Sequence, residues 1–267
     1  MRINADISLK NVQDVYSGAE GNLWELIMGE QIHIGGLTSS TDLANKANIA
    51  SGSRGVDLCC CSGAGMRFLV RFRSVAAMKG VDATPKVIEQ GQLRCQSDGS
   101  TDQISFIQAP ATATGLDGAS ADFVWGEDAW CYVQDKPALI AEAARIVKTG
   151  GTIAFTDWVE GPGGLADEEA LRFMQFMKFP TLESLDGYQK LLQDNRCEVI
   201  HAENTGRYVP CMDLYLTMLD KQLTYDALRI IGFDMDLMQW LAGEMAFIQQ
   251  LAHADKIIQG LFVARKL

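Results

Sequence analysis

Small and acidic residues mark the ends of two neighbouring strand-like segments in this 267-residue chain. The stretch VDLCCCSGAGMRFLVRF is typical of a strand, a turn of small residues and a helix. Gly63 and Gly65 let the backbone approach a ligand closely, and the N-terminus of the helix offers free N–H groups to an anion. Asp82 ends the next strand, where a carboxylate can accept both hydroxyls of a ribose. Together these features predict a nucleoside-bearing cofactor.

Each of these features also has a simpler structural interpretation. Any α/β protein can contain a tight strand–helix turn, and Asp82 could be a solvated strand end. A nicotinamide cofactor prefers the pattern G-x-G-x-x-G/A, whereas GAGMRF places Phe68 at the last position. The residues therefore do not identify the cofactor by themselves, but they disfavour a dehydrogenase.

Short apolar runs alternate with helical stretches from Gly55 onward, which predicts a parallel sheet with helices on both faces. In the helix DKPALIAEAARIV, Asp135 is the expected N-cap and Pro137 fits the first turn. The closing run KIIQGLFVARKL follows a long helical region over about 209–253 and predicts an antiparallel last strand. The other strands are expected at 55–59, 77–81, 104–108, 121–126, 151–156 and 197–203.

The first fifty residues show no strand alternation and predict helices. One short amphipathic helix should end near Gly29, and a second should begin at the N-cap residues Ser40 and Thr41. We expect residues 159–190 to form an insertion of one or two helices over the carboxyl edge of the sheet.

Composition narrows the class of partner. The net charge is −11, from 34 acidic and 23 basic residues, which argues against nucleic acid because binding phosphates needs a basic face. The seven cysteines form no C-x-x-C pair, so no metal site is predicted. No apolar run reaches the ~18 residues of a membrane helix, and no signal segment is evident. We expect a cytoplasmic protein that partners with neither membrane nor nucleic acid, with a homodimer as the oligomer to test.

The order of the motifs VDLCCCSGAG, GVDAT, ISFIQAPATATGLDGASADFVWGEDAW and ARIVKTGGTIAFTDW resembles the class I S-adenosylmethionine-dependent methyltransferases. The segments LWELIMGEQIHIGG, WGEDAWCYVQDK and LDGYQKLL resemble the sarcosine and dimethylglycine N-methyltransferases in particular. This resemblance implies a Rossmann-like, doubly wound α/β fold with a mostly parallel seven-stranded sheet and an antiparallel last strand. It implies one domain over 1–267, with an N-terminal helical cap (1–50), a cofactor-binding half (51–158), and lid helices with the C-terminal strands (159–267).

The same resemblance implies methyl transfer from S-adenosylmethionine to a small-molecule amine of the sarcosine type, with S-adenosylhomocysteine as product. Asp82 would bind the ribose, and Glu127 would face both the sulfonium and the acceptor. The remaining cofactor-binding positions are Asp57, Cys59, Cys61 and Gly63 around the methionine part, and Ala83, Thr84, Gln108 and Ala109 around the adenine.

Four positions depart from the family pattern. Cys59 and Cys61 stand where glycines are expected, and a Cβ there crowds the methionine part or disfavours a positive φ. Pro110 stands where many relatives have an aspartate for the adenine amino group. Thr149 replaces a common proline and is harmless.

Cationic amines are commonly held by aromatic faces and carboxylates, which makes aromatic residues the acceptor-binding candidates. His33 is predicted by resemblance to line the pocket, and we assign His33, Glu127 and Trp130 as candidate catalytic residues. The candidate substrate-binding residues are Tyr16, Trp24, Trp130, Tyr132, Trp158 and Tyr208. For each of these aromatics, core packing is an equally acceptable explanation.

Two alternatives to methyl transfer stay open at this point. The chain could catalyse another reaction on the same fold, with S-adenosylmethionine as an aid, or it could be a non-catalytic binding protein that lost the cofactor. The cysteine-containing turn and Pro110 motivate both alternatives.

Overall fold

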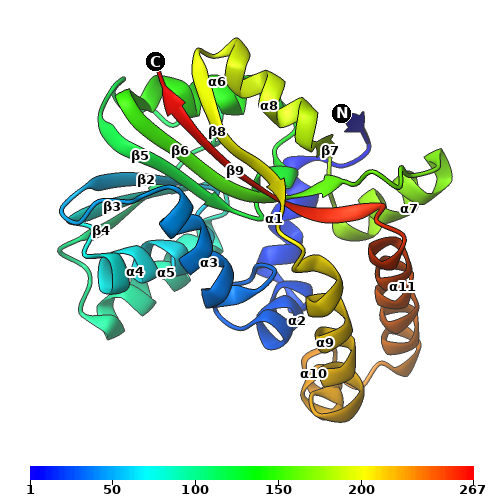
Figure 1. Cartoon of the computed structure of the whole chain (residues 1–267). Helices are drawn as coiled ribbons and strands as arrows, with labels where there is room; N and C mark the ends of the chain where they lie inside the picture. The colour runs from blue at the N-terminus through cyan, green and yellow to red at the C-terminus, as the bar shows by residue number, and fades with distance from the viewer.

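The computed structural model describes all 267 residues and contains one central sheet (Figure 1). Its main strands lie in the order β4-β3-β2-β5-β6-β9-β8, and only β9 among them is antiparallel to its neighbours. The predicted seven-stranded sheet with an antiparallel last strand is confirmed. The strands are β2 (Arg54–Leu58), β3 (Ala77–Asp82), β4 (Ile104–Gln108), β5 (Ala121–Glu127), β6 (Val147–Glu160), β8 (Cys197–Asn204) and β9 (Ile257–Lys266).

Two short strands extend this sheet beyond the expectation. β7 (Thr181–Ser184) pairs in parallel with the far end of β6, and β1 (Arg2–Ile3) pairs antiparallel with β7. The first residues of the chain are thereby attached to the edge of the sheet that carries the inserted segment. β6 can pair with β7 because it continues past its predicted end at residue 156.

Helices cover both faces of the sheet and bury two apolar clusters. α6 (Lys136–Ile146) and α8 (Leu185–Asp194) pack on one face. The opposite face is covered by α3 (Gly36–Lys46), α4 (Ala64–Arg73) and α5 (Pro85–Asp98).

The helix α6 shows how the local sequence specifies this packing. Its predicted apolar face, which includes Leu139, Ile140 and Ala143, is fully buried against the sheet. The Asp135 side chain accepts a hydrogen bond from the Ala138 N–H at 2.9 Å, so the predicted N-cap is confirmed.

The N-terminal cap differs in one detail from the prediction. α3 begins at Gly36 rather than at Ser40, because Gly35 adopts a left-handed conformation that starts the helix one turn earlier. Ser40 is therefore inside the helix and buried, and its hydroxyl lies 3.2 Å from Nε2 of His33. The rest of the cap consists of α1 (Leu9–Ser17) and α2 (Ala19–Met28).

The remaining helices form a separate group beside the cap. A third apolar cluster joins α2 and the inserted α7 (Asp167–Met177) to helices near the C-terminus. Figure 1 shows these C-terminal helices projecting away from the sheet below α2. No helix is long and apolar enough to cross a membrane. The projecting helices are α9 (Tyr208–Lys221), α10 (Thr224–Ile230) and α11 (Met235–His253).

The order of the strands reverses at β2, which pairs with β3 on one side and β5 on the other. In sheets of this kind, the crevice beyond the carboxyl ends at the reversal point is the usual ligand site. The loops that follow β2, β3 and β5 are therefore where the fold predicts chemistry.

Candidate active site

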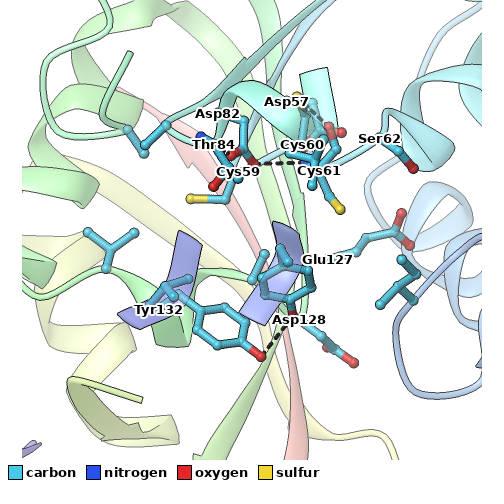
Figure 2. Close-up of a pocket in the computed structure, with 18 of the residues that line it drawn as sticks. Asp57, Cys59, Cys60, Cys61, Ser62, Asp82, Thr84, Glu127, Asp128 and Tyr132 are labelled. Atoms are coloured by element: carbon cyan, nitrogen blue, oxygen red, sulfur yellow. Dashed lines mark hydrogen bonds between the residues drawn. The ribbon is translucent and has the colours of Figure 1, made fainter. Parts of the chain in front are cut away.

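A cavity of about 340 Å³ lies beyond the carboxyl ends of β2, β3 and β5. The turn that follows β2 and Asp82 form one wall, and Tyr132 faces them from the opposite side (Figure 2). The N-terminal cap closes a third side through α1 and through the loop before α3, which contributes Ile32 and His33. The site is thus assembled from segments that are far apart in the sequence.

The turn after β2 has a glycine-like backbone at two cysteines. Cys59 and Cys61 have φ values of 61° and 47°, in the left-handed region, and both line the cavity. Side chains disfavour this region, so the structure confirms the expectation that the turn suits glycine at both positions. Burial raises the pKa of both thiols, which keeps them protonated.

Gly65, in the first turn of α4, approaches the end of β5 closely. A Cβ atom at this position would lie 2.7 Å from Oε2 of Glu127. Any other residue would displace this carboxylate. The first N–H groups of α4 have no partner within the helix, and Ala64 and Gly65 line the cavity, which favours an anionic group there.

Asp82 holds the turn and the start of α5 together. Its carboxylate accepts hydrogen bonds from the Cys61 N–H at 2.9 Å and from the Thr84 N–H at 2.8 Å. Burial raises the pKa of Asp82, while these backbone donors lower it. A carboxylate oxygen accepts more than one hydrogen bond, so Asp82 retains acceptor capacity toward the cavity.

Glu127 and His33 meet at the base of the cavity. Oε1 of Glu127 lies 3.4 Å from Nε2 of His33, and Oε2 accepts a hydrogen bond from the Trp125 indole at 3.0 Å. Oε1 of Glu127 and Nδ1 of His33 are buried without a hydrogen-bond partner. Both residues line the cavity, and each has one buried polar atom that no protein group pairs with.

Two tyrosines lie on the wall opposite the turn. The hydroxyl of Tyr16 donates a hydrogen bond to that of Tyr132 at 2.8 Å, and the rings meet edge to face with centroids 5.4 Å apart. Burial raises the pKa of both phenols. This pair connects α1 to the segment after β5 and closes the cavity on that side.

Acidic side chains dominate the charged groups of the cavity lining. No lysine or arginine lines it, and His33 is the one residue there that can gain a positive charge. Burial raises the pKa of Asp57, and the nearby charges of Glu127 and Asp82 raise it further. The acidic residues are Glu30, Asp57, Asp82, Glu127, Asp128 and Asp135. A cationic ligand would therefore be attracted to this cavity.

The structure brings most of the predicted site residues together. The predicted residues that line the cavity are Tyr16, His33, Asp57, Cys59, Cys61, Asp82, Ala83, Thr84, Glu127 and Tyr132. Gly63, Gln108 and Ala109 lie just outside the lining. Gly63 instead starts α4, with a φ of 74°.

The expectation that Trp130 faces the cavity is wrong. Its indole packs over Gly126, donates a hydrogen bond to the Leu58 carbonyl at 3.1 Å and stacks on Phe155. The ring is fully buried in the core on the α6 side of the sheet. Its hydrogen bond and its stacking partner are both satisfied within the protein, which makes it a packing residue.

Three other aromatic candidates also lie elsewhere. Trp158 and Tyr208 pack edge to face with centroids 5.0 Å apart, in the cluster below the cavity. Trp24 lines a different cavity, between α2 and the C-terminal helices. The placement of these three beside the acceptor is therefore wrong.

Sequence reasoning missed several residues of the lining. Gln31 precedes His33 and has a buried Oε1 atom without a partner. Asp128 follows Glu127 and accepts a hydrogen bond from the Ile34 N–H at 2.8 Å, which ties the cap loop to β5. Ala111 and Thr112 line the cavity beside Pro110, which the sequence had singled out, where Gln108 and Ala109 were expected. The adjacency of Gln31 and Asp128 to predicted residues was the only signal available.

Comparison with known proteins agrees with this geometry. A family profile described as a methyltransferase domain matches residues 56–155, which span β2 to β6. Residues 56–155 therefore resemble a methyltransferase domain. It is 24% identical to phosphoethanolamine N-methyltransferase 1 of Triticum aestivum over 80% of this chain and 41% of that protein. It is 28% identical to 27-O-demethylrifamycin SV methyltransferase of Amycolatopsis mediterranei over 71% of this chain and 75% of that protein.

Solved structures share the fold of this chain. A candidate sarcosine dimethylglycine methyltransferase from Galdieria sulphuraria superposes with a TM-score of 0.82 at 20% identity, covering 93% of this chain and 98% of that one. The [4+2]-cyclase SpnF superposes with a TM-score of 0.77 at 15% identity, covering 96% of both chains. The fold is therefore shared by proteins of different activity. The match spans less than half the length of the wheat enzyme.

Proposed function

We propose that the cavity binds S-adenosylmethionine. Asp82 would accept hydrogen bonds from the ribose hydroxyls, and the free N–H groups at the start of α4 would hold the carboxylate of the methionine part. The close approach at Gly65, where a Cβ would meet Glu127, leaves backbone rather than side chain against that part. The negative lining suits the positive sulfonium. When bound, this cofactor supplies an electrophilic methyl group.

The acceptor atom in this proposal is an amine nitrogen. The observation that carries it is the buried Oε1 atom of Glu127, which has no hydrogen-bond partner and lies beside His33. An amine can donate an N–H to this oxygen and satisfy it, and the bond also fixes the direction of the nitrogen lone pair. Where the acceptor arrives as an ammonium, Glu127 or His33 takes up its proton.

Once the carboxylate of the cofactor occupies the N–H groups at the start of α4, the same lining argues against an acceptor that carries a phosphate or carboxylate. Such a group would be buried among Asp57, Asp82 and Glu127 without any lysine or arginine to pair with it. We therefore rank a plain amine with an apolar body above sarcosine, dimethylglycine and phosphoethanolamine. Ile7, Leu9 and Val12 from the N-terminal segment offer the apolar surface for that body.

The two tyrosines on the wall opposite the turn have a separate role in this proposal. Tyr16 and Tyr132 exclude water from the acceptor, which otherwise hydrates the amine lone pair. Ser40 supports the site from behind, because its hydroxyl at 3.2 Å from Nε2 of His33 fixes the imidazole ring.

An acceptor panel tests this function. Purified protein and S-adenosylmethionine are incubated with phenethylamine and butylamine, and in parallel with glycine, sarcosine, dimethylglycine and phosphoethanolamine, with products measured by mass spectrometry. We expect methylation of the plain amines to exceed that of the acidic acceptors. Faster methylation of sarcosine or phosphoethanolamine would contradict the charge argument.

A second candidate function is a reaction other than methyl transfer, with the cofactor as an electrostatic aid. Its motive is the pair of side chains at Cys59 and Cys61, which narrow the turn at two glycine-like positions. Binding of S-adenosylmethionine without release of S-adenosylhomocysteine, across the whole panel, would favour it. A protein that binds neither compound would instead fit the third alternative, a non-catalytic relative.

A further inference from the structure

A second cavity, of about 270 Å³, lies among α2, α7 and the projecting helices α9, α10 and α11. It shares no lining residue with the first cavity. Its walls are almost wholly apolar, and 11 of the 14 residues that line it are hydrophobic. Its size is near the lower end of the range for small-molecule sites, which is about 300–1,000 Å³.

Aromatic rings line this cavity and continue to its rim. Trp24 of α2 meets Phe176 of α7 edge to face, with centroids 6.5 Å apart. Phe176 in turn meets Trp240 of α11 at 5.5 Å, and Trp240 is half exposed. An apolar ligand would thus have a path from the surface into the interior along these rings.

The polar residues of this cavity are Glu20, Asp220 and Thr224. The Thr224 hydroxyl already donates to backbone carbonyls of α9. Neither Glu20 nor Asp220 forms an ion pair or accepts a side-chain hydrogen bond. Lys178 is near enough to lower the pKa of Glu20, but burial raises that pKa by more.

Asp220 is exposed to solvent and lines the cavity. It lies in the last turn of α9, where the helix dipole disfavours a negative charge. Two carboxylates without partners on an otherwise apolar wall, beside aromatic rings, form a setting that binds a cation attached to an apolar body.

We propose that this second cavity binds a lipophilic monoamine, with the apolar body against Trp24 and Phe176 and the ammonium at Glu20 and Asp220. This site is separate from the proposed methyl-transfer site. A fatty acid would be repelled by both carboxylates, and a neutral lipid would leave them unpaired. A lipophilic amine therefore matches both the apolar rings and the unpaired carboxylates of the wall.

Titration calorimetry with 4-phenylbutylamine, 4-phenylbutanol and 4-phenylbutyrate tests the charge preference. We expect the amine to bind at least tenfold more tightly than the alcohol and the acid. The double variant Glu20→Gln/Asp220→Asn should lose that preference and keep its affinity for the alcohol. Asp236→Asn, an exposed carboxylate on α11 outside the lining, is the matched control and should change nothing.

A second pair of variants locates the site. Both variants are made in a Glu127→Gln background, which removes the amine contact of the first cavity. There, Ala242→Phe places a ring at the exposed edge of the second cavity and should abolish amine binding, whereas Gln239→Phe, on the exposed side of the same helix, should not. Circular dichroism melting confirms that both variants fold. Equal binding of amine and acid, or amine binding that survives Ala242→Phe, overturns the proposal. Amine binding that is lost only in Glu127→Gln would place the amine in the first cavity and also overturn it.

Discussion

Nε2 of His33 lies 3.4 Å from Oε1 of Glu127, which joins the N-terminal cap to the carboxyl end of β5. The two residues are 94 positions apart in the chain, yet both line the same cavity, and each has one buried polar atom without a partner in the protein. The pair is held from both sides. Ser40 contacts the His33 ring, and the Trp125 indole donates to the other oxygen of Glu127. Such support from neighbouring side chains is what a preorganised polar site requires.

Replacing Asp82 should weaken cofactor binding. Asp82→Ala removes a buried carboxylate acceptor, and the loss of a hydrogen bond to a charged group costs roughly 1.5–3 kcal/mol, or about ten- to a hundredfold in affinity. Titration calorimetry with S-adenosylhomocysteine measures this change. Asp102→Ala, at an exposed position away from the cavity, is the control. An unchanged dissociation constant in a folded Asp82→Ala variant would remove Asp82 from the cofactor site.

Glycine at the two left-handed cysteines should relieve strain. A left-handed conformation costs a non-glycine residue roughly 1–2 kcal/mol, and the greater freedom of glycine in the unfolded chain offsets about half of that gain. Cys59→Gly/Cys61→Gly should therefore keep or raise the free energy of unfolding and bind S-adenosylmethionine more tightly. Cys60→Gly, at a buried position with an ordinary φ, should destabilise the protein. Weaker cofactor binding in the double variant would show that the thiols are favourable contacts.

Trp130 and Tyr132 should behave in opposite ways. Trp130→Leu leaves a void in the core and should lower the free energy of unfolding by about 2–4 kcal/mol while leaving the KM of the acceptor unchanged. Tyr132→Phe keeps the ring, loses the bond to Tyr16 and should raise that KM severalfold at near-constant stability. Thermal melting and steady-state kinetics on both variants measure the difference. A raised KM of the acceptor for Trp130→Leu would instead support Trp130 as an acceptor-binding residue.

Asp157 should make stability depend on pH. Its carboxylate accepts hydrogen bonds from the Tyr188 hydroxyl and the Cys131 N–H, but burial raises its pKa to about 6. The folded state therefore binds more protons than the unfolded state between about pH 4 and pH 6, so the contribution of Asp157 to stability falls as pH rises through that window.

Asp157→Asn removes this titration. Relative to the wild type, the free energy of unfolding of the variant should rise by about 3 kcal/mol between pH 4 and pH 7, since each unit of pKa shift corresponds to about 1.4 kcal/mol. Urea titrations at several pH values measure both curves. Parallel curves would show that Asp157 ionises in the folded state as it does in the unfolded chain.

The fold was predictable because each strand is a short apolar run followed by a helix with a readable start, as at Asp135. The positions of Asp82 and Glu127 followed from this, since each ends a strand at the reversal point of the sheet. The start of α3 was not predictable from Ser40 alone, because the conformation of Gly35 decided it.

The aromatic candidates were less predictable for a physical reason. Trp130 and Tyr132 both follow β5, and the sequence does not say which ring turns into the core. Gly126 decides it, because the absence of a side chain there makes room for the Trp130 indole. The place of Trp24 depends on helices about 200 residues later in the chain, and no local pattern predicts such contacts.

The destination of the methyl group tests the central claim most directly. Purified protein is given S-adenosylmethionine with a trideuterated methyl group and an equimolar mixture of phenethylamine, 2-phenylethanol and 3-phenylpropionate. We predict that mass spectrometry finds the label on the amine nitrogen alone, and that Glu127→Gln lowers the rate by about a hundredfold or more. Label on an oxygen atom, or an undiminished rate in Glu127→Gln, would contradict the account.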